Sequence, residues 1–164
     1  MEKSADKVSK QESLHGKIVR EILPGFAERL KKEEVISAYD RHPFSIPLVE
    51  DQPPIKIIPD LVVHLPNRGK VLVEIANPRD PKRFLGEIVY PHFLGYHKKI
   101  TKVIIFVLHD PEHQPIHDRS FSQKMMLTQI FGRLTPTIMA SWHRDEKTAY
   151  HNLKYILKRF LKGK

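Results

Sequence analysis

The sequence contains no cysteine, which excludes disulfide bonds and thiolate metal sites. It also lacks long hydrophobic runs, since apolar stretches such as residues 103–108 fall far short of the ~20 residues that a membrane-spanning helix needs. Residues 1–7 are mixed in charge and contain no apolar core of the kind that directs secretion. We therefore expect a protein without membrane spans that stays in the cytoplasm.

Acidic residues are few relative to basic ones. The chain has 19 Asp and Glu against 28 Lys and Arg, and its formal net charge is +9. Such an excess favours polyanionic partners, because cations that neutralise phosphates release condensed counterions. Nucleic acid is therefore the expected class of partner. The basic residues are spread along the whole chain, so a generally basic and soluble surface is the alternative explanation.

Glycine is scarce, with 7 residues against 13 prolines, and this composition predicts abrupt element boundaries and stiff connections. After a frayed tail at residues 1–10, we predict a single domain over residues 11–164. Apolar residues recur at helical spacing over 14–23, and Pro24-Gly25 should bend or end this helix before a second helical piece at 26–34. Residues 40–54 have little helical periodicity and predict a loop.

The rest of the chain alternates between apolar strand-like runs and helical patterns, which predicts an α/β fold. We expect a mixed central sheet of four to five strands flanked by helices. The run at 103–108 should pair parallel to the strand before it, because a helix connects the two. The final helix should pack its apolar face on the sheet, and the alternative for this basic amphipathic helix is a membrane surface or a partner's groove. The predicted elements are strands at about 55–63, 71–76, 103–108 and 137–142, and helices at 81–96, 121–134 and 147–162.

Two carboxylates, Asp60 and Glu74, interrupt the first two apolar runs. An ionised carboxylate is rarely buried without a partner, so the two acids are expected to share something that neutralises them. A divalent cation is the candidate of most chemical consequence. The alternative is that each acid lies at a strand end, exposed or hydrogen-bonded to nearby backbone.

The loop between these runs, Pro66-Asn67-Arg68-Gly69, decides whether the acids can cooperate. If Gly69 takes the left-handed position of a three-residue loop, Asp60 lies opposite Ala76 and Glu74 lies opposite Val62. The two acids are then diagonal neighbours on one face of the sheet. An unbulged four-residue loop would instead put them on opposite faces.

The order of elements and acids from residue 58 to residue 108, with the preceding helix, resembles the restriction-endonuclease-like superfamily, whose motif is PD-(D/E)xK. Pro59-Asp60 matches the first half of this motif and Glu74 matches its second acid. The resemblance implies a three-layer α/β/α fold in which Asp60 and Glu74 hold Mg²⁺ or Mn²⁺ with the Ile75 carbonyl as a third ligand. It also implies that Glu21 corresponds to an acid on the first helix.

The motif ends in a lysine, and this chain has Ala76 there. An alanine methyl group cannot bind water, transfer a proton or offset charge on a phosphate. Lys82, at the start of the following helix, is the preferred substitute. Lys56 and Lys70 are further candidates because each lies four residues before one of the acids and so on the same strand face.

Three functions remain open from the sequence. The first is a magnesium-dependent DNA endonuclease that hydrolyses phosphodiester bonds, with possible dimerisation. The second, favoured by Ala76, is a catalytically inactive nucleic-acid-binding or assembly domain on the same fold. The third is an unrelated α/β protein whose two acids are incidental, which a placement of Asp60 and Glu74 on opposite faces of the sheet would establish.

Overall fold

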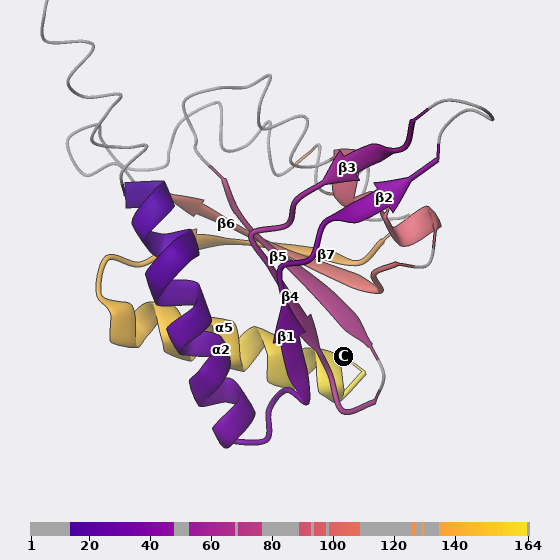
Figure 1. Cartoon of the computed structure of the whole chain (residues 1–164). Coiled ribbons are helices and arrows are strands. Elements are labelled where there is room, and N and C mark those ends of the chain that lie inside the picture. The colour runs from indigo at the N-terminus through magenta and orange to yellow at the C-terminus, as the bar shows by residue number, and fades with distance from the viewer. Residues whose placement is uncertain are drawn as a thin grey trace, which may run out of the picture.

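The computed structural model describes residues 14–47, 53–67, 69–76, 89–92, 94–97, 99–108, 126, 129 and 135–163. Its centre is a mixed five-stranded sheet, so the predicted α/β class is confirmed (Figure 1). The two pairings on the β1 side are antiparallel, and the β5–β6 and β6–β7 pairings are parallel, as predicted for β5 and β6. The spatial order is β1 (Ala38–Asp40), β4 (Leu61–His64), β5 (Lys70–Ala76), β6 (Lys102–Leu108) and β7 (Thr137–Trp142).

A second, two-stranded antiparallel sheet pairs β2 (Phe44–Ile46) with β3 (Ile55–Ile57). The prediction of a loop over 40–54 was therefore wrong at β2. The predicted strand at about 55–63 was also wrong as a single element. It is two strands in different sheets, separated at Pro59, because a proline cannot donate to a ladder and confines strand pairing to one side of it.

The first helix is continuous over residues 14–32, so Pro24-Gly25 does not end it. Its middle is the π-helical η1 (Ile18–Ile22), and its last part is α2 (Leu23–Lys32). Pro24 lies in the first turn of α2, where a missing N–H costs little. The Leu23 N–H just before it donates five residues back, to the Ile18 carbonyl. This wider turn lets the chain pass the proline without breaking the helix.

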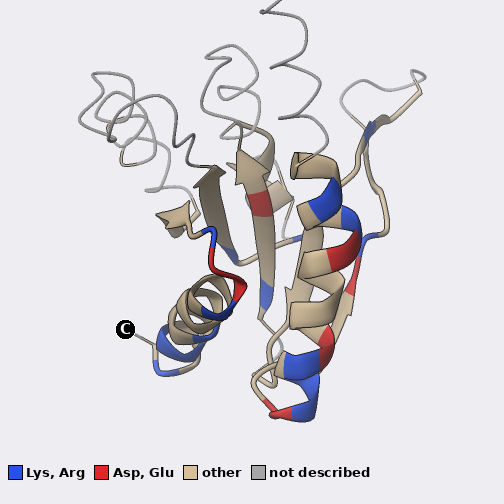
Figure 2. Ribbon diagram, turned by 90° about the vertical axis from the view of Figure 1, so that its left-hand side faces the viewer, with Lys and Arg blue, Asp and Glu red and all other residues tan. Residues whose placement is uncertain are grey.

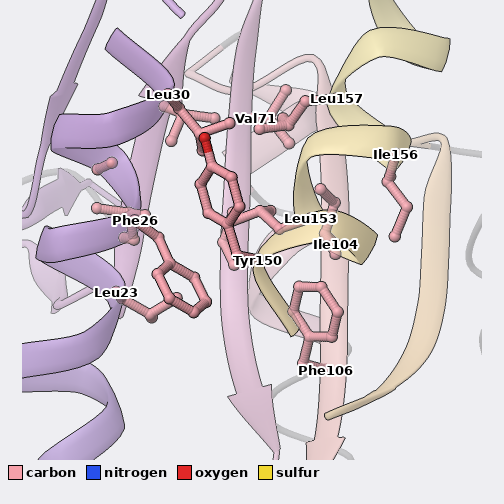
Figure 3. Close-up of a cluster of buried hydrophobic side chains, with 14 of the residues drawn as sticks. Leu23, Phe26, Leu30, Val71, Ile104, Phe106, Tyr150, Leu153, Ile156 and Leu157 are labelled. Atoms are coloured by element: carbon pink, nitrogen blue, oxygen red, sulfur yellow. The ribbon is translucent and has the colours of Figure 1, made fainter. Parts of the chain in front are cut away.

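Helices α2 and α5 (Glu146–Leu161) cover one face of the sheet, where alternate residues of β4, β5 and β6 form the larger core (Figure 3). The apolar face of α5 is buried there, as predicted, so it is not available to a membrane or a partner's groove. The opposite face carries a smaller core with Ile46, Leu94 and Ile100 over residues from β4, β5 and β6. Among the described residues, no helix is both long and apolar enough to cross a membrane.

The β4–β5 hairpin differs from its predicted register by two residues. His64 pairs with Lys70, and Leu65 N donates to Gly69 O at 2.7 Å. The expectation of a left-handed Gly69 was wrong, since positive φ values among the described residues belong to Glu34 and Gly163. Instead, Asn67 Oδ1 accepts a hydrogen bond from Gly69 N at 3.2 Å and supports the reversal from its own side chain.

Lys102 joins the start of β6 to the end of α5, and its replacement by methionine should be measurable. Lys102 Nζ donates to Phe160 O at 3.1 Å and lies 4.5 Å from the centroid of the Phe160 ring. A cation at a helix carboxyl terminus and over an aromatic ring is stabilising, so Lys102→Met should lower the free energy of unfolding by about 1 kcal/mol in urea titrations. Lys158→Met, at an exposed position near the same end, should cost less than about 0.5 kcal/mol. Equal losses would contradict this role for Lys102.

Candidate functional site

The hydrogen-bond ladder between β4 and β5 stops at the Pro-Asp motif. The bond from Leu65 N to Gly69 O identifies the pairs that exchange hydrogen bonds, and these recur at every second position. Continued in steps of two, the register would next join Ile75 to Pro59. Because Pro59 has no N–H, it cannot complete this pair. The Ile75 C=O therefore has no donor at this pair, and the Ile75 N–H also bonds outside the ladder, because the pairing of β4 with β5 ends at Leu61 and Val73.

Two side chains from distant parts of the chain supply the partners of these two groups. Asp60 Oδ2 accepts a hydrogen bond from Ile75 N at 2.8 Å, and His15 Nε2 lies 3.1 Å from Ile75 O. Since a carbonyl oxygen only accepts, Nε2 carries the proton in this contact. His15 Nε2 is also 3.6 Å from Asp60 Oδ2, and the two side chains are 21% and 15% exposed. We call this group of Asp60, Ile75 and His15 the Ile75 corner.

The Ile75 corner lies at the carboxyl end of β5, beside the start of the first helix (Figure 1). Its side chains are mostly buried but still reach solvent. The helix lies on the face of α2 and α5, and His15 reaches the sheet where β4 has left the edge of β5. The corner therefore brings an imidazole nitrogen to 3.1 Å from a carbonyl oxygen and 3.6 Å from a carboxylate oxygen, at the place where the pairing of β4 with β5 ends.

Glu74 adjoins this corner in the sequence, and alternation along β5 places it on the face of Leu72 and Ala76, which belongs to the smaller core. Val62 pairs with Leu72, so the predicted pairing of Glu74 with Val62 was wrong, and the register differs from the prediction by two residues. Asp60 precedes β4 and lies outside the ladder, where its carboxylate contacts Ile75 N and His15 of the first helix. That the two acids share one side of the sheet stays a prediction.

The other residues predicted from the motif do not gather at the corner. Glu21 is exposed on η1, six residues beyond His15, which corresponds to about 9 Å along a helix. Lys82 lies outside the described residues. Lys56 belongs to β3 in the smaller sheet, and Lys70 begins β5, four residues and about 13 Å along the strand from Glu74. Ala76 is fully buried in the smaller core.

The donor set of the corner suits a divalent cation. The Asp60 carboxylate and the Ile75 carbonyl are oxygen ligands of the kind that Mg²⁺ and Mn²⁺ take, and Glu74, next to Ile75 in β5, is a further carboxylate close by in the sequence. The nearby imidazole of His15 adds a nitrogen, which Mn²⁺ accepts more readily than Mg²⁺ does. In the part of the chain that the structure describes, no three His, Asp or Glu side chains are already grouped around a metal position. Of the proposed metal ligands, the Asp60 carboxylate and the Ile75 carbonyl are therefore the two that the structure already holds close to one atom.

Sequence reasoning placed Glu74 on the correct strand, put Asp60 inside a strand although it lies between β3 and β4, and missed His15. The signal was weak. His15 precedes the buried Ile18 and Val19 by three and four residues, which places it on the inner side of the helix. Nothing in that spacing shows that its partners lie 45 and 60 residues further along the chain.

A second histidine–carboxylate pair lies on the outer strands. Asp40 Oδ2 is 2.7 Å from His64 Nε2, and Asp40 Oδ1 accepts a hydrogen bond from His42 N at 3.1 Å. Burial raises the pKa of Asp40, but the hydrogen bonds with His64 and with the His42 N–H outweigh it and hold the pKa below its usual value. The pair joins β1 to β4, the strand that begins directly after Asp60.

This pKa predicts a loss of stability in acid. The folded-state pKa of Asp40 lies below the unfolded one, so its contribution is present above the ordinary carboxyl pKa and is lost as the pH falls through the folded pKa. Asp40→Asn should cost about 1 kcal/mol at pH 7, and its stability should then fall less steeply than that of the wild type between about pH 5 and pH 2. Urea unfolding at a series of pH values tests this, and parallel profiles would contradict it.

Comparisons with protein-family models, with curated proteins and with solved structures gave no match. The function must therefore be argued from the Ile75 corner and its surroundings.

Proposed function

We propose that this chain is a metal-dependent phosphodiesterase that acts on nucleic acid, with its metal held by Asp60, Glu74 and the Ile75 carbonyl. One observation carries the proposal: Asp60 Oδ2 and Ile75 O lie 3.6 and 3.1 Å from the same atom, His15 Nε2. Two oxygen ligands that lie this close together at a partly exposed strand end supply part of the coordination shell that a divalent cation needs. The order of helix and strands around them agrees with the family that the sequence resembles.

Each residue of the corner has a defined task in this proposal. The hydrogen bond from Ile75 N fixes the orientation of the Asp60 carboxylate before any metal binds. On metal binding, His15 would give up the Nε2 proton that it donates to Ile75 O and serve as a nitrogen ligand, which would shift the preference of the site from Mg²⁺ toward Mn²⁺. When bound, the metal would supply a water of lowered pKa and charge to balance the phosphate. Ala76 contributes nothing polar, so this chain relies on the metal more than a protein with the motif lysine would.

The charge of the surface supports a polyanionic substrate. Figure 2 shows basic residues along α5, and the sequence has no Asp or Glu after Glu146. The apolar side of this helix is in the core, so its cations lie on the outer side. Such a surface attracts nucleic acid from a distance, in a manner that salt weakens. The exposed cations of α5 and its C-cap are Lys147, Lys158, Arg159 and Lys162.

The proposal is tested by metal binding and cleavage together. Titration of the purified chain with Mn²⁺, followed by electron paramagnetic resonance, should show one site, and pulsed spectra should show coupling to a nitrogen nucleus. His15→Gln should remove that coupling, whereas His97→Gln, at an exposed position, should keep it. Labelled DNA and RNA should be cleaved with Mn²⁺, and more slowly with Mg²⁺. Absence of both metal binding and cleavage would overturn the proposal.

A catalytically inactive nucleic-acid-binding domain is the second candidate. The buried Ala76 favours it, because the motif lysine is absent, and so does the Asp60–Ile75 hydrogen bond, because it gives Asp60 a structural task without any metal. Salt-dependent binding without cleavage, unchanged by Asp60→Asn, would select this function.

A further inference from the structure

The two-stranded sheet of β2 and β3 has an outer face that takes no part in either core. Phe44, Ile46 and Ile57 point inward and pack against the smaller core, where Ile46 is 1% exposed. Ser45 and Lys56 are directly paired on the other side, and both are exposed. Strand alternation continued by one residue beyond each end would place four more residues on this side, all of which are exposed. The outer face thus consists of Pro43, Ser45, Pro47, Pro54, Lys56 and Ile58.

The chemistry of this outer face is unusual for a protein surface. It holds three prolines and an isoleucine that is 68% exposed, with one cation, one hydroxyl and no acid. Its inner side is anchored by the buried Ile46, so the face is a fixed platform rather than a free loop. A partner that fits it needs an apolar surface and a negative charge close together.

The outer face leads directly into the Ile75 corner. β3 continues through Ile58 and Pro59 to Asp60, and two residues of extended chain span at most about 7 Å. Figure 1 shows the two-stranded sheet set beside the main sheet, with β3 joined to β4. A nucleic acid whose phosphate reaches Asp60 therefore places its neighbouring nucleotide next to Ile58, and the next phosphates near Lys56.

We propose that this outer face binds unpaired nucleotides beside the phosphate to be cleaved, so that the substrate is single-stranded or locally opened nucleic acid. This inference rests on the proposed function. Apolar side chains can contact the flat face of a base only when that face is not stacked within a duplex. A closed duplex presents phosphates and groove edges, which would call for several cations where this face has one. Ile58 contacts the base and Lys56 the backbone.

The experiment compares a labelled 20-nucleotide single strand with the matching duplex by fluorescence anisotropy. Asp60→Asn serves as the background, so that no cleavage interferes. Single-strand binding should be at least about tenfold tighter than duplex binding. Ile58→Ala should weaken single-strand binding by about tenfold and leave duplex binding nearly unchanged, since base contacts contribute about 1–3 kcal/mol each. Lys56→Ala should reduce the salt dependence of single-strand binding by about 0.7 in log–log slope.

Tyr155→Ala is the matched control, because Tyr155 is 63% exposed on α5, outside the outer face. It should leave single-strand binding unchanged. Binding to the duplex that equals or exceeds binding to the single strand would overturn the inference, and so would equal effects of Ile58→Ala and Tyr155→Ala. The proposed function can fail separately: preserved single-strand preference and Ile58 dependence, without metal binding or cleavage in the wild type, would reject catalysis and retain the binding face.

Discussion

Asp60→Ala should abolish metal-dependent cleavage and also destabilise the fold, whereas Asp60→Asn should abolish cleavage with a much smaller effect on stability. A metal ligand of this kind stabilises several kcal/mol of charge in the transition state, so both variants should lose on the order of 10³-fold in rate. Asparagine keeps an oxygen that can accept the hydrogen bond from Ile75 N. Alanine leaves that N–H without an acceptor, which should cost about 1–3 kcal/mol. Single-turnover cleavage with Mn²⁺ and urea unfolding measure the two effects.

The difference between these two variants separates the two tasks of Asp60. Asp40→Asn provides the control, because it removes a carboxylate that binds His64 and not the Ile75 corner, and it should keep cleavage. Cleavage by Asp60→Asn at the wild-type rate would contradict the metal-binding task. Wild-type stability of Asp60→Ala would contradict the backbone-capping task.

The central strands could be predicted because each is a run of apolar, largely β-branched residues buried on both faces. The predicted runs at 71–76 and 103–108 differ from β5 and β6 by one residue each. The run at 137–142 matches β7, an edge strand whose residues are mostly half-buried. A strand that is buried on both faces can be predicted without an alternation of polar and apolar residues, because its apolar composition already indicates it. The parallel pairing of β5 and β6 followed from the length of the connection between them.

The short strands could not be predicted in the same way. β1, β2 and β3 have three residues each, too few to show a period, and the prolines around β2 indicate a loop as readily as a strand end. Their pairing depends on tertiary contacts, above all on Ile46 in the smaller core. The outer face of β2 and β3 therefore could not be predicted from the sequence, although Ile58 and Asp60 are only two residues apart along the chain.

The candidate site shows the same division. Asp60 and Glu74 follow from a local motif, and only the even shift of the hairpin register, continued one step beyond β4, bears on their predicted common side. His15 contacts Asp60 and the Ile75 carbonyl across 45 and 60 residues, and no local pattern encodes such contacts. The register itself shifted because Asn67 closes the turn with its side chain, where a left-handed Gly69 had been expected. Local chemistry thus determined which residues matter, and tertiary packing determined which of them meet.

The largest loss of stability is expected from Tyr150→Ala. Tyr150 lies between α2 and α5 over the sheet, among the largest fully buried side chains (Figure 3). Its ring meets the Phe26 ring edge-on at a centroid distance of 5.3 Å, and the Arg29 guanidinium carbon lies 3.9 Å from the centroid of the Tyr150 ring. Phe26 in turn stacks on Trp142 with a centroid distance of 5.9 Å. The Phe26 ring of α2 therefore contacts both Tyr150 of α5 and Trp142 at the end of β7.

Truncation of Tyr150 removes these contacts and leaves a cavity that three separate elements would have to close. The expected loss is about 3–5 kcal/mol in the free energy of unfolding, a large part of the total for a single domain. Tyr155→Ala removes the same ring from a site on α5 that is 63% exposed and should cost less than about 0.5 kcal/mol. Urea unfolding, followed by far-ultraviolet circular dichroism, compares the two variants. Similar losses would mean that helix propensity, and not packing between α2 and α5, dominates at these positions.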